Sequence, residues 1–370
     1  MNSRPIPFLD LARQHAELGP ELRAAFERVT NSSAFILGEE VERFEEEFAA
    51  YCGVRHCVGT ASGTAALTLA LLAAGIGRGD EVIVPAHTFV SSAFSILHAG
   101  AVPVLCDVED GTGLLDVGSA DAVTSERTAA VIAVHLYGQL CDMEAVGGFA
   151  ERRGILVFED AAQAHGASDG GRRAGALGTA AGFSFYPSKN LGAIGDAGAI
   201  TTDDAAIAER ARSLRNLGQR TKGEHADVGF NERLDGLQAA VLRIKLERLD
   251  EWNRQRRLRA ASYVDALDGA ARVLDVRNPD ACVYHLFPVR VWDRDGLQSR
   301  LADVGVETGV HYSRALHGHA ALRDVCITNC EVPNSDAWAA LELSLPIYPG
   351  LADADIKRVA TVCKEHAALR

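Results

Sequence analysis

The chain has 370 residues, of which 48% are hydrophobic and 24% are charged, and its formal net charge is -13 at pH 7. This composition is typical of a folded globular protein and excludes an intrinsically disordered chain, while the length predicts two domains. The negative charge, with no basic stripe, argues against nucleic acid as a partner, although a local pocket could still bind a phosphorylated small molecule.

The sequence of the N-terminal region indicates helices and gives no sign of a targeting segment. Residues 1–5 are not followed by an apolar stretch, and the sequence has no apolar run long enough to cross a membrane, so we expect a cytoplasmic protein without a membrane partner. The spacing of apolar residues predicts amphipathic helices over 10–30 and 39–52. This helical arm could pack on a second subunit.

From residue 56 onward, short apolar runs alternate with helical segments. The expected strands are 56–59, 82–85, 102–107, 130–135, 155–160, 182–186 and 199–201. Helices are expected to begin near Thr64 and Ser91. The alternation predicts βαβ units and a mostly parallel sheet with helices on both faces. Because ligands of such sheets bind beyond the carboxyl ends of the strands, the loops after each strand are candidate sites.

The loop after the first strand, residues 60–67, is built of small and hydroxyl-bearing residues. Backbone N–H groups, a helix dipole and the hydroxyls of Ser62 and Thr64 at a helix start suit a phosphate group. A routine helix N-cap would explain the same Ser-Gly-Thr segment, so both interpretations remain open here.

An aromatic residue follows the second strand. Phe89 stands at the expected mouth of this strand, where its ring could stack on a heteroaromatic ligand. An ordinary core phenylalanine is the alternative.

A carboxylate ends the apolar strand 155–158. Asp160 at this position needs a cationic or N–H partner if it is buried. A pyridinium nitrogen would be such a partner, because an ionised aspartate keeps the ring protonated and able to withdraw electrons from a substrate carbanion. A structural salt bridge or a helix N-cap competes with this interpretation.

A single lysine stands between the apolar run 183–186 and the Gly-rich segment 192–198. If Lys189 is held inward at the strand end, loss of hydration lowers its pKa and frees the neutral amine for Schiff-base chemistry with an aldehyde. A solvated surface lysine is the alternative.

Together, these four loops supply the parts of one cofactor site. Their order along the chain is a phosphate cradle at Thr64, a ring stacker at Phe89, a carboxylate at Asp160 and a Schiff-base lysine at Lys189. The arrangement resembles the pyridoxal 5'-phosphate site of the type I (aspartate aminotransferase-like) fold. We therefore expect an α/β protein with a mostly parallel sheet in a large domain, and a smaller C-terminal α/β domain.

The remainder of the chain predicts that smaller domain. A long helix is expected over 233–267, followed by a strand at 284–291, a helix near 297–304 and an extended segment at 309–312. We place a large cofactor-binding domain with the N-terminal helical arm at 1–240 and the small domain at 241–370. The eight cysteines are scattered without a CxxC pair, so we expect reduced thiols and no metal site.

Four sequence segments carry a family resemblance. They are 62–67 (Ser-Gly-Thr-Ala-Ala-Leu), 159–166 (Glu-Asp-Ala-Ala-Gln-Ala-His-Gly), the lysine stretch 183–198, and 229–235 (Gly-Phe-Asn-Glu-Arg-Leu-Asp). With a weaker match at 7–11, the chain resembles the DegT/DnrJ/StrS family of sugar aminotransferases over essentially its whole length.

The resemblance implies roles for individual residues. Lys189 would be the Schiff-base lysine, Asp160 the partner of the pyridine nitrogen, and Gln163 the neighbour of the ring hydroxyl. Phe89 would be the ring stacker. The phosphate ligands would be Ser62, Gly63, Thr64 and Ser184. Asn231 would reach the phosphate of the other subunit, which implies a homodimer with shared active sites.

Within the family, residues 185–196 and 135–139 are most similar to enzymes that aminate C3 of nucleotide-linked, for example dTDP-linked, 3-keto-6-deoxyhexoses. L-Glutamate is the amino donor that the resemblance implies. Two departures concern the sugar site: Ser188 replaces a frequent glycine, and the substrate loop 311–317, which begins with His311 and Tyr312, lacks the usual prolines.

The segment before Asn231 is polar and carries Arg220, Lys222 and His225. All three side chains could meet the diphosphate of a sugar nucleotide, and a solvated loop is the alternative for each. Two other functions remain open: amination of a 4-keto sugar, and a non-catalytic regulator that binds the cofactor. Lys189 argues against the regulator.

Overall fold

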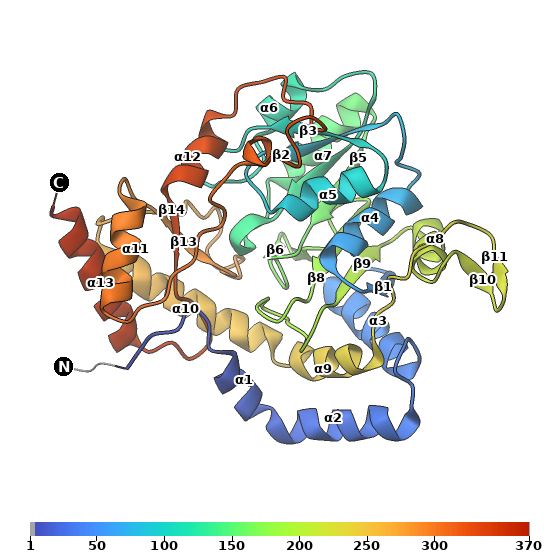
Figure 1. Ribbon diagram of the computed structural model, residues 1–370, viewed down its shortest axis with the longest axis horizontal. Helices are drawn as coiled ribbons and strands as arrows, with labels where there is room; N and C mark the ends of the chain where they lie inside the picture. Colours follow the sequence, from blue (N-terminus) through green and yellow to red (C-terminus); the bar gives the residue numbers. More distant parts are fainter. Residues whose placement is uncertain (1–3, 370) are drawn as a thin grey trace.

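The computed structural model describes residues 4–369, and its largest element is a seven-stranded sheet (Figure 1). In spatial order the strands are β1 (His56–Thr60), β9 (Gly198–Thr202), β8 (Ala180–Ser184), β5 (Leu156–Asp160), β4 (Thr128–Val134), β2 (Glu81–Pro85) and β3 (Val102–Cys106). Strands β8, β5, β4, β2 and β3 pair in parallel, whereas β9 is antiparallel to both β8 and β1. All seven expected strands are confirmed.

Helices cover both faces of this sheet, as expected of βαβ units. They include α4 (Gly63–Ala73), α5 (Val90–His98), α6 (Val117–Ala122), α7 (Met143–Arg153) and α8 (Ala205–Arg215). Helix α4 packs across β8 and β9 and is buried along nearly its whole length. The carboxyl ends of β1, β2, β4, β5 and β8 lie at one edge of the sheet, so the loops that follow them converge there.

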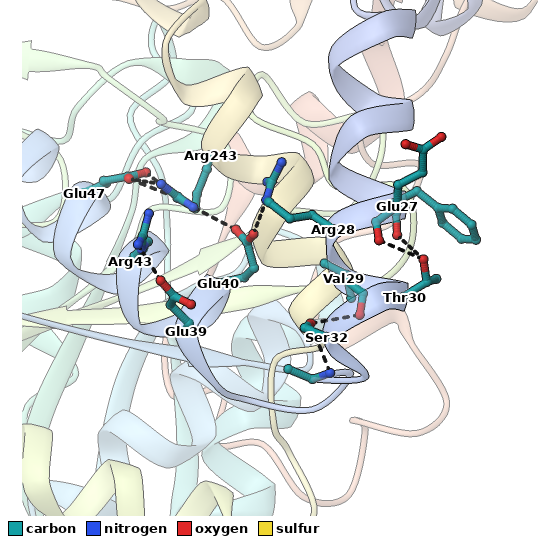
Figure 2. Close-up of polar contacts among 12 residues, drawn as sticks. Glu27, Arg28, Val29, Thr30, Ser32, Glu39, Glu40, Arg43, Glu47 and Arg243 are labelled. Carbon is teal, nitrogen blue, oxygen red and sulfur yellow. Dashed lines mark hydrogen bonds and ion pairs between the residues drawn. The ribbon is translucent and has the colours of Figure 1, made fainter.

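The N-terminal arm is formed by α1 (Leu11–Glu17), α2 (Gly19–Ser32) and α3 (Glu39–Cys52). The expectation of one helix over 10–30 is wrong, because the chain turns at Leu18 and Pro20 occupies the first turn of α2, where its missing N–H costs nothing. Figure 2 shows how charges fix this arm: Arg243 binds Glu40 at 2.7 Å and Glu47 at 2.7 Å.

The expected helix over 233–267 is also divided. Helix α9 (Gly236–Leu246) and α10 (Leu249–Leu267) are separated by a tight turn at Glu247 and Arg248, where Arg248 N–H bonds the carbonyl of Lys245. The two helices pack on different neighbours: α9 on α2 and α3, and α10 on α13 (Asp353–Ala367). A change of direction between them satisfies both contacts.

A second sheet lies beside α10, near both described chain ends (Figure 1). It consists of antiparallel strands β12 (Arg272–Val273), β13 (Phe287–Arg290) and β14 (Glu342–Leu345), with α11 (Arg294–Asp303) and α12 (Pro333–Leu341) against it. The expected extended segment at 309–312 contributes a single bridge, Gly309 to Ser344. Two further strand pairs are β6 (Ser168–Asp169) with β7 (Arg172–Arg173), and β10 (Gln219–Thr221) with β11 (Glu224–His225). Within residues 4–369 there is no helix of the length and apolarity needed to cross a membrane.

Candidate active site

A pocket of about 330 Å³ opens at the carboxyl ends of the parallel strands. Its walls combine loops of the large sheet with a segment that precedes β14. The sequence-predicted residues that line it are Ser62, Gly63, Thr64, Phe89, Asp160, Gln163, Ser184, Lys189, His311 and Tyr312. The structure therefore brings ten of the predicted residues, from positions far apart in the sequence, to one cavity.

Lys189 lies in the loop between β8 and β9, which is held in a compact shape. Its backbone N–H bonds the carbonyl of Tyr186 at 2.8 Å, and the buried amide of Asn190 donates to Val283 O and Asn253 Oδ1, both at 2.9 Å. Burial lowers the pKa of Lys189 to about 8, and the opposing charge of Asp160 limits that fall. About a tenth of the amine is therefore neutral at pH 7, far more than for an ordinary lysine.

Asp160 ends β5 and is buried. Its Oδ2 accepts a hydrogen bond from the hydroxyl of Ser92 at 2.7 Å, and its Oδ1 accepts from the N–H of Ala162 at 3.2 Å. Thr88 in turn bonds Ser92 at 3.0 Å. These donors fix the direction of the Asp160 carboxyl group.

The N-terminus of α4 forms another part of the pocket wall. Ser62 is the N-cap and accepts the N–H of Ala65 at 3.1 Å, while the Thr64 hydroxyl donates to Ser91 at 2.9 Å. The glycines here permit close backbone approach: a Cβ on Gly63 would lie 2.6 Å from the Cβ of Ser184, and one on Gly198 would lie 2.3 Å from Ser62 O. The free N–H groups of a helix N-terminus suit an anion.

Two aromatic side chains, Phe89 and Tyr312, and the amide of Gln163 also line the pocket. Phe89 is 50% exposed and its ring centroid lies 5.3 Å from that of Tyr312, so it is not a core phenylalanine. Gln163 accepts the N–H of Tyr137 at 2.7 Å and donates to the Tyr312 hydroxyl at 3.1 Å. Tyr137 adopts a positive φ of 64°, which turns its N–H toward Gln163.

Comparison with known proteins identifies this arrangement. The model of the DegT/DnrJ/EryC1/StrS aminotransferase family matches residues 16–364. The chain belongs to this family.

Several curated relatives and solved structures align with this chain over nearly its whole length. A "dTDP-3-amino-3,4,6-trideoxy-alpha-D-glucose transaminase" of Streptomyces venezuelae is 46% identical over 98% of this chain and 96% of the relative. A "Pleiotropic regulatory protein" of Geobacillus stearothermophilus is 42% identical over 94% and 95%. The structure of S. venezuelae DesV in complex with a ketimine intermediate has a TM-score of 0.95 at 44% identity and 99% coverage of both chains.

A more distant solved structure, NtdA from Bacillus subtilis with bound cofactor PMP, has a TM-score of 0.90 at 28% identity and covers 99% of this chain and 87% of NtdA. The expected fold class is confirmed: the α/β fold with a mostly parallel sheet is that of the pyridoxal phosphate-dependent aminotransferases.

Three of the predicted site residues do not line the pocket that a single chain of this aminotransferase forms. Arg220 and His225 lie on the exposed β10–β11 hairpin, which projects from the body in Figure 1. There Arg220 lies 3.8 Å from Asp227, and His225 Nδ1 bonds the carbonyl of Leu217 at 2.9 Å. Asn231 is exposed and forms a bridge with Asn216. Their roles stay predictions.

Sequence reasoning missed several residues that support the site. Ser92, which bonds Asp160, follows Ser91 at a helix start and is indistinguishable by sequence from an N-terminal hydroxyl of a helix. His285 lines the pocket, and its Nδ1 pairs with Asn190 Oδ1 at 3.1 Å. Burial and the charge of Lys189 lower the pKa of His285, so its ring is neutral.

Proposed function

We propose that this aminotransferase uses pyridoxal 5'-phosphate to transfer an amino group from L-glutamate to C3 of a dTDP-linked 3-keto-6-deoxyhexose. The observation that carries the proposal is one pocket that holds Lys189, with its pKa lowered to about 8, opposite the buried carboxylate of Asp160. The names of the curated relatives support the nucleotide sugar and the C3 position.

The residues present fit this cofactor. The N-terminus of α4, with Ser62, Gly63, Thr64 and nearby Ser184, would hold the phosphate, and Asp160 would hold the protonated pyridine nitrogen. Phe89 and Gln163 would contact the ring face and the ring hydroxyl. When bound, pyridoxal phosphate supplies an electron sink that stabilises negative charge at the carbon that carries the amino group.

Lys189 would perform two tasks in this site. Its neutral amine would attach the resident cofactor. Once a substrate amine displaces it, Lys189 would accept the proton from the α-carbon of L-glutamate. In the second half-reaction it would deliver a proton to C3 of the sugar. A pKa near the working pH suits both directions of proton transfer. The Ser92 hydroxyl, which donates to Oδ2, would hold the Asp160 carboxyl group in position throughout.

We further propose a cytoplasmic homodimer in which Asn231 of one subunit contacts the phosphate site of the other. Exposed apolar side chains support such an interface: Val228 is 95%, Ile194 46% and Leu217 45% exposed in the single chain. The neighbouring hairpin would then carry Arg220 and His225 toward the diphosphate of a sugar nucleotide bound by the second subunit. His311 and Tyr312 would contact the sugar from within the same chain.

The test is the regiochemistry of the product. Incubation with L-glutamate and either dTDP-3-keto- or dTDP-4-keto-6-deoxyhexose, followed by NMR, should give the 3-amino sugar only. Formation of the 4-amino sugar would support the alternative ketone. No amino sugar from either ketone would favour a regulator, a function suggested by the name of one relative at 42% identity.

A further inference from the structure

Glu342 is a buried carboxylate that the proposed reaction does not yet use. It lies on β14 with Ser344 two residues further along, so both side chains point to the same face of the strand, and both are fully buried. Among residues 4–369 no cation forms an ion pair with Glu342. Its oxygens accept instead from the backbone N–H of His311 at 2.5 Å and from the hydroxyl of Ser344. Because an unpaired buried carboxylate is costly, it calls for an explanation.

Ser344 connects this carboxylate to an imidazole in the pocket. Its oxygen lies 2.9 Å from Nδ1 of His311. A serine hydroxyl has one proton, which Ser344 donates to Glu342, so its oxygen must accept a proton from Nδ1 of His311. In this chain of hydrogen bonds, His311 carries its proton on Nδ1 and a lone pair on Nε2.

His311 lines the pocket, and Nε2 is the ring nitrogen that these hydrogen bonds leave free. His311 lines the cavity together with Lys189 and Tyr312, and Phe8 stacks against its ring at 5.7 Å between centroids. Within the described part of the chain, no side chain bonds to Nε2. Burial, with the charge of Lys189, lowers the pKa of His311 to about 4, so the ring is neutral and Nε2 is an acceptor.

We propose that Glu342, acting through Ser344, is a positioning residue that holds His311 in the Nδ1–H tautomer so that Nε2 accepts a hydrogen bond from a sugar hydroxyl. This role rests on the proposed function. An acceptor lone pair matches a hydroxyl and repels a carboxylate. The contact therefore favours the keto sugar over the amino acid donor when the two alternate in one pocket.

Glu342→Gln reverses the chain of hydrogen bonds with almost no change of shape. The amide oxygen can still accept the N–H of His311, but the amide NH₂ then donates to Ser344, whose hydroxyl turns to Nδ1 of His311. The imidazole would then present Nε2–H, a donor, to the pocket. Ser344→Ala breaks the same link by removing the hydroxyl, while the Glu342 contact to the His311 N–H stays.

The experiment measures binding and one half-reaction at about pH 8, where Glu342, whose pKa burial raises to about 7, is mostly ionised. Calorimetry with the pyridoxamine phosphate form gives the affinity for the unreactive dTDP-3-amino sugar and for dTDP alone. Stopped-flow absorbance gives the rate of the L-glutamate half-reaction. Glu81→Gln is the matched control, because Glu81 is another buried glutamate bonded to a serine, Ser125, but outside the pocket.

We expect Glu342→Gln and Ser344→Ala to weaken binding of the amino sugar by about fivefold to fiftyfold, the range for loss of a buried hydrogen bond. Affinity for dTDP and the L-glutamate rate should stay within about twofold of the wild type. Unchanged sugar affinity in both variants would overturn the role of Glu342. A parallel fall in dTDP affinity and the L-glutamate rate would overturn it as well, since it would show general damage to the pocket. A wild type that binds no dTDP-linked sugar would overturn the proposed function, and this role with it.

Discussion

The hydroxyl of Ser92, on helix α5, donates a 2.7 Å hydrogen bond to Oδ2 of Asp160, at the end of strand β5. The two residues are 68 positions apart in the sequence and both are buried. The bond stabilises the negative charge on the carboxylate that would face the pyridine nitrogen of the cofactor. Replacing Ser92 therefore tests how strongly the hydrogen bond to Asp160 affects the rate of the reaction.

Ser92→Ala should lower kcat by about tenfold or more, because a hydrogen bond to a buried charged group contributes about 1.5–3 kcal/mol. Steady-state kinetics with L-glutamate and the keto sugar would measure the loss. Ser213→Ala is the control: Ser213 is another buried serine, and its hydroxyl bonds no described residue. Equal rates in Ser92→Ala and the control would contradict the role of Ser92.

The reactivity of Lys189 should depend on pH in a defined way. Its pKa of about 8 means that the neutral amine, about a tenth of the total at pH 7, becomes the main form above pH 8. The rate at which the cofactor-free protein attaches pyridoxal phosphate, followed by visible absorbance, should rise up to about pH 8 and then level off. A rate that keeps rising toward the ordinary lysine pKa would contradict a buried Lys189, and Lys189→Ala should show no attachment.

The phosphate site should depend on the close approach of two backbone segments. Gly198→Ala would place a Cβ 2.3 Å from Ser62 O, so the loop at Ser62 or strand β9 must move. We expect affinity for pyridoxamine phosphate, measured by fluorescence titration, to fall by about tenfold, since overpacking costs about 1–3 kcal/mol.

Gly147→Ala on helix α7 is the matched control, because its added Cβ would meet no heavy atom within 4 Å. It should leave cofactor affinity unchanged and slightly stabilise the helix. Unchanged affinity in Gly198→Ala would show that Ser62 does not shape the phosphate site.

The shared active site of the proposed dimer can be tested by complementation between inactive subunits. Lys189→Ala removes the nucleophile, and Asn231→Asp places a negative charge against the phosphate expected in the other subunit. Each variant alone should be nearly inactive. Refolded together in equal amounts, they should recover about a quarter of wild-type activity, because half of the dimers are hybrids with one intact site of two.

The control for complementation combines Lys189→Ala with Asp160→Ala. These two residues line the same pocket of one chain, so no hybrid contains an intact site. Activity should therefore recover when Lys189→Ala is refolded with Asn231→Asp, and should not recover when it is refolded with Asp160→Ala. Recovery with neither would contradict a contribution of Asn231 across the interface.

The central sheet could be predicted from the sequence because its strands are short apolar runs bounded by polar, glycine or proline residues. Each strand lies within two residues of its expected limits. The antiparallel direction of β9 could not be predicted, since a buried strand has the same composition in either direction. The break between α9 and α10 could not be predicted, because the apolar spacing continues through Glu247. Only the different packing partners of the two helices require a turn there. The boundary between domains at residue 240 stays a prediction.

Most of the pocket could be predicted because its residues directly follow strands, as Asp160 follows the core of β5. The supporting contacts could not. Ser92 meets Asp160, and Glu342 meets His311, only through the tertiary fold, and neither pair leaves a local pattern in the sequence. Arg220, His225 and Asn231 show a similar limit: all three are exposed in the single chain, and the sites in which they are proposed to act would belong to a second subunit.

The most direct test of the proposed reaction is the visible absorption spectrum of the protein with pyridoxal phosphate, recorded alone, after L-glutamate, and again after a dTDP-3-keto-6-deoxyhexose. We predict a band from the cofactor attached to Lys189, its loss with L-glutamate, and its return with the 3-keto sugar. Return with only a 4-keto sugar would contradict amination at C3. Absence of the band after addition of pyridoxal phosphate would contradict the assignment of Lys189 and the proposed reaction as a whole.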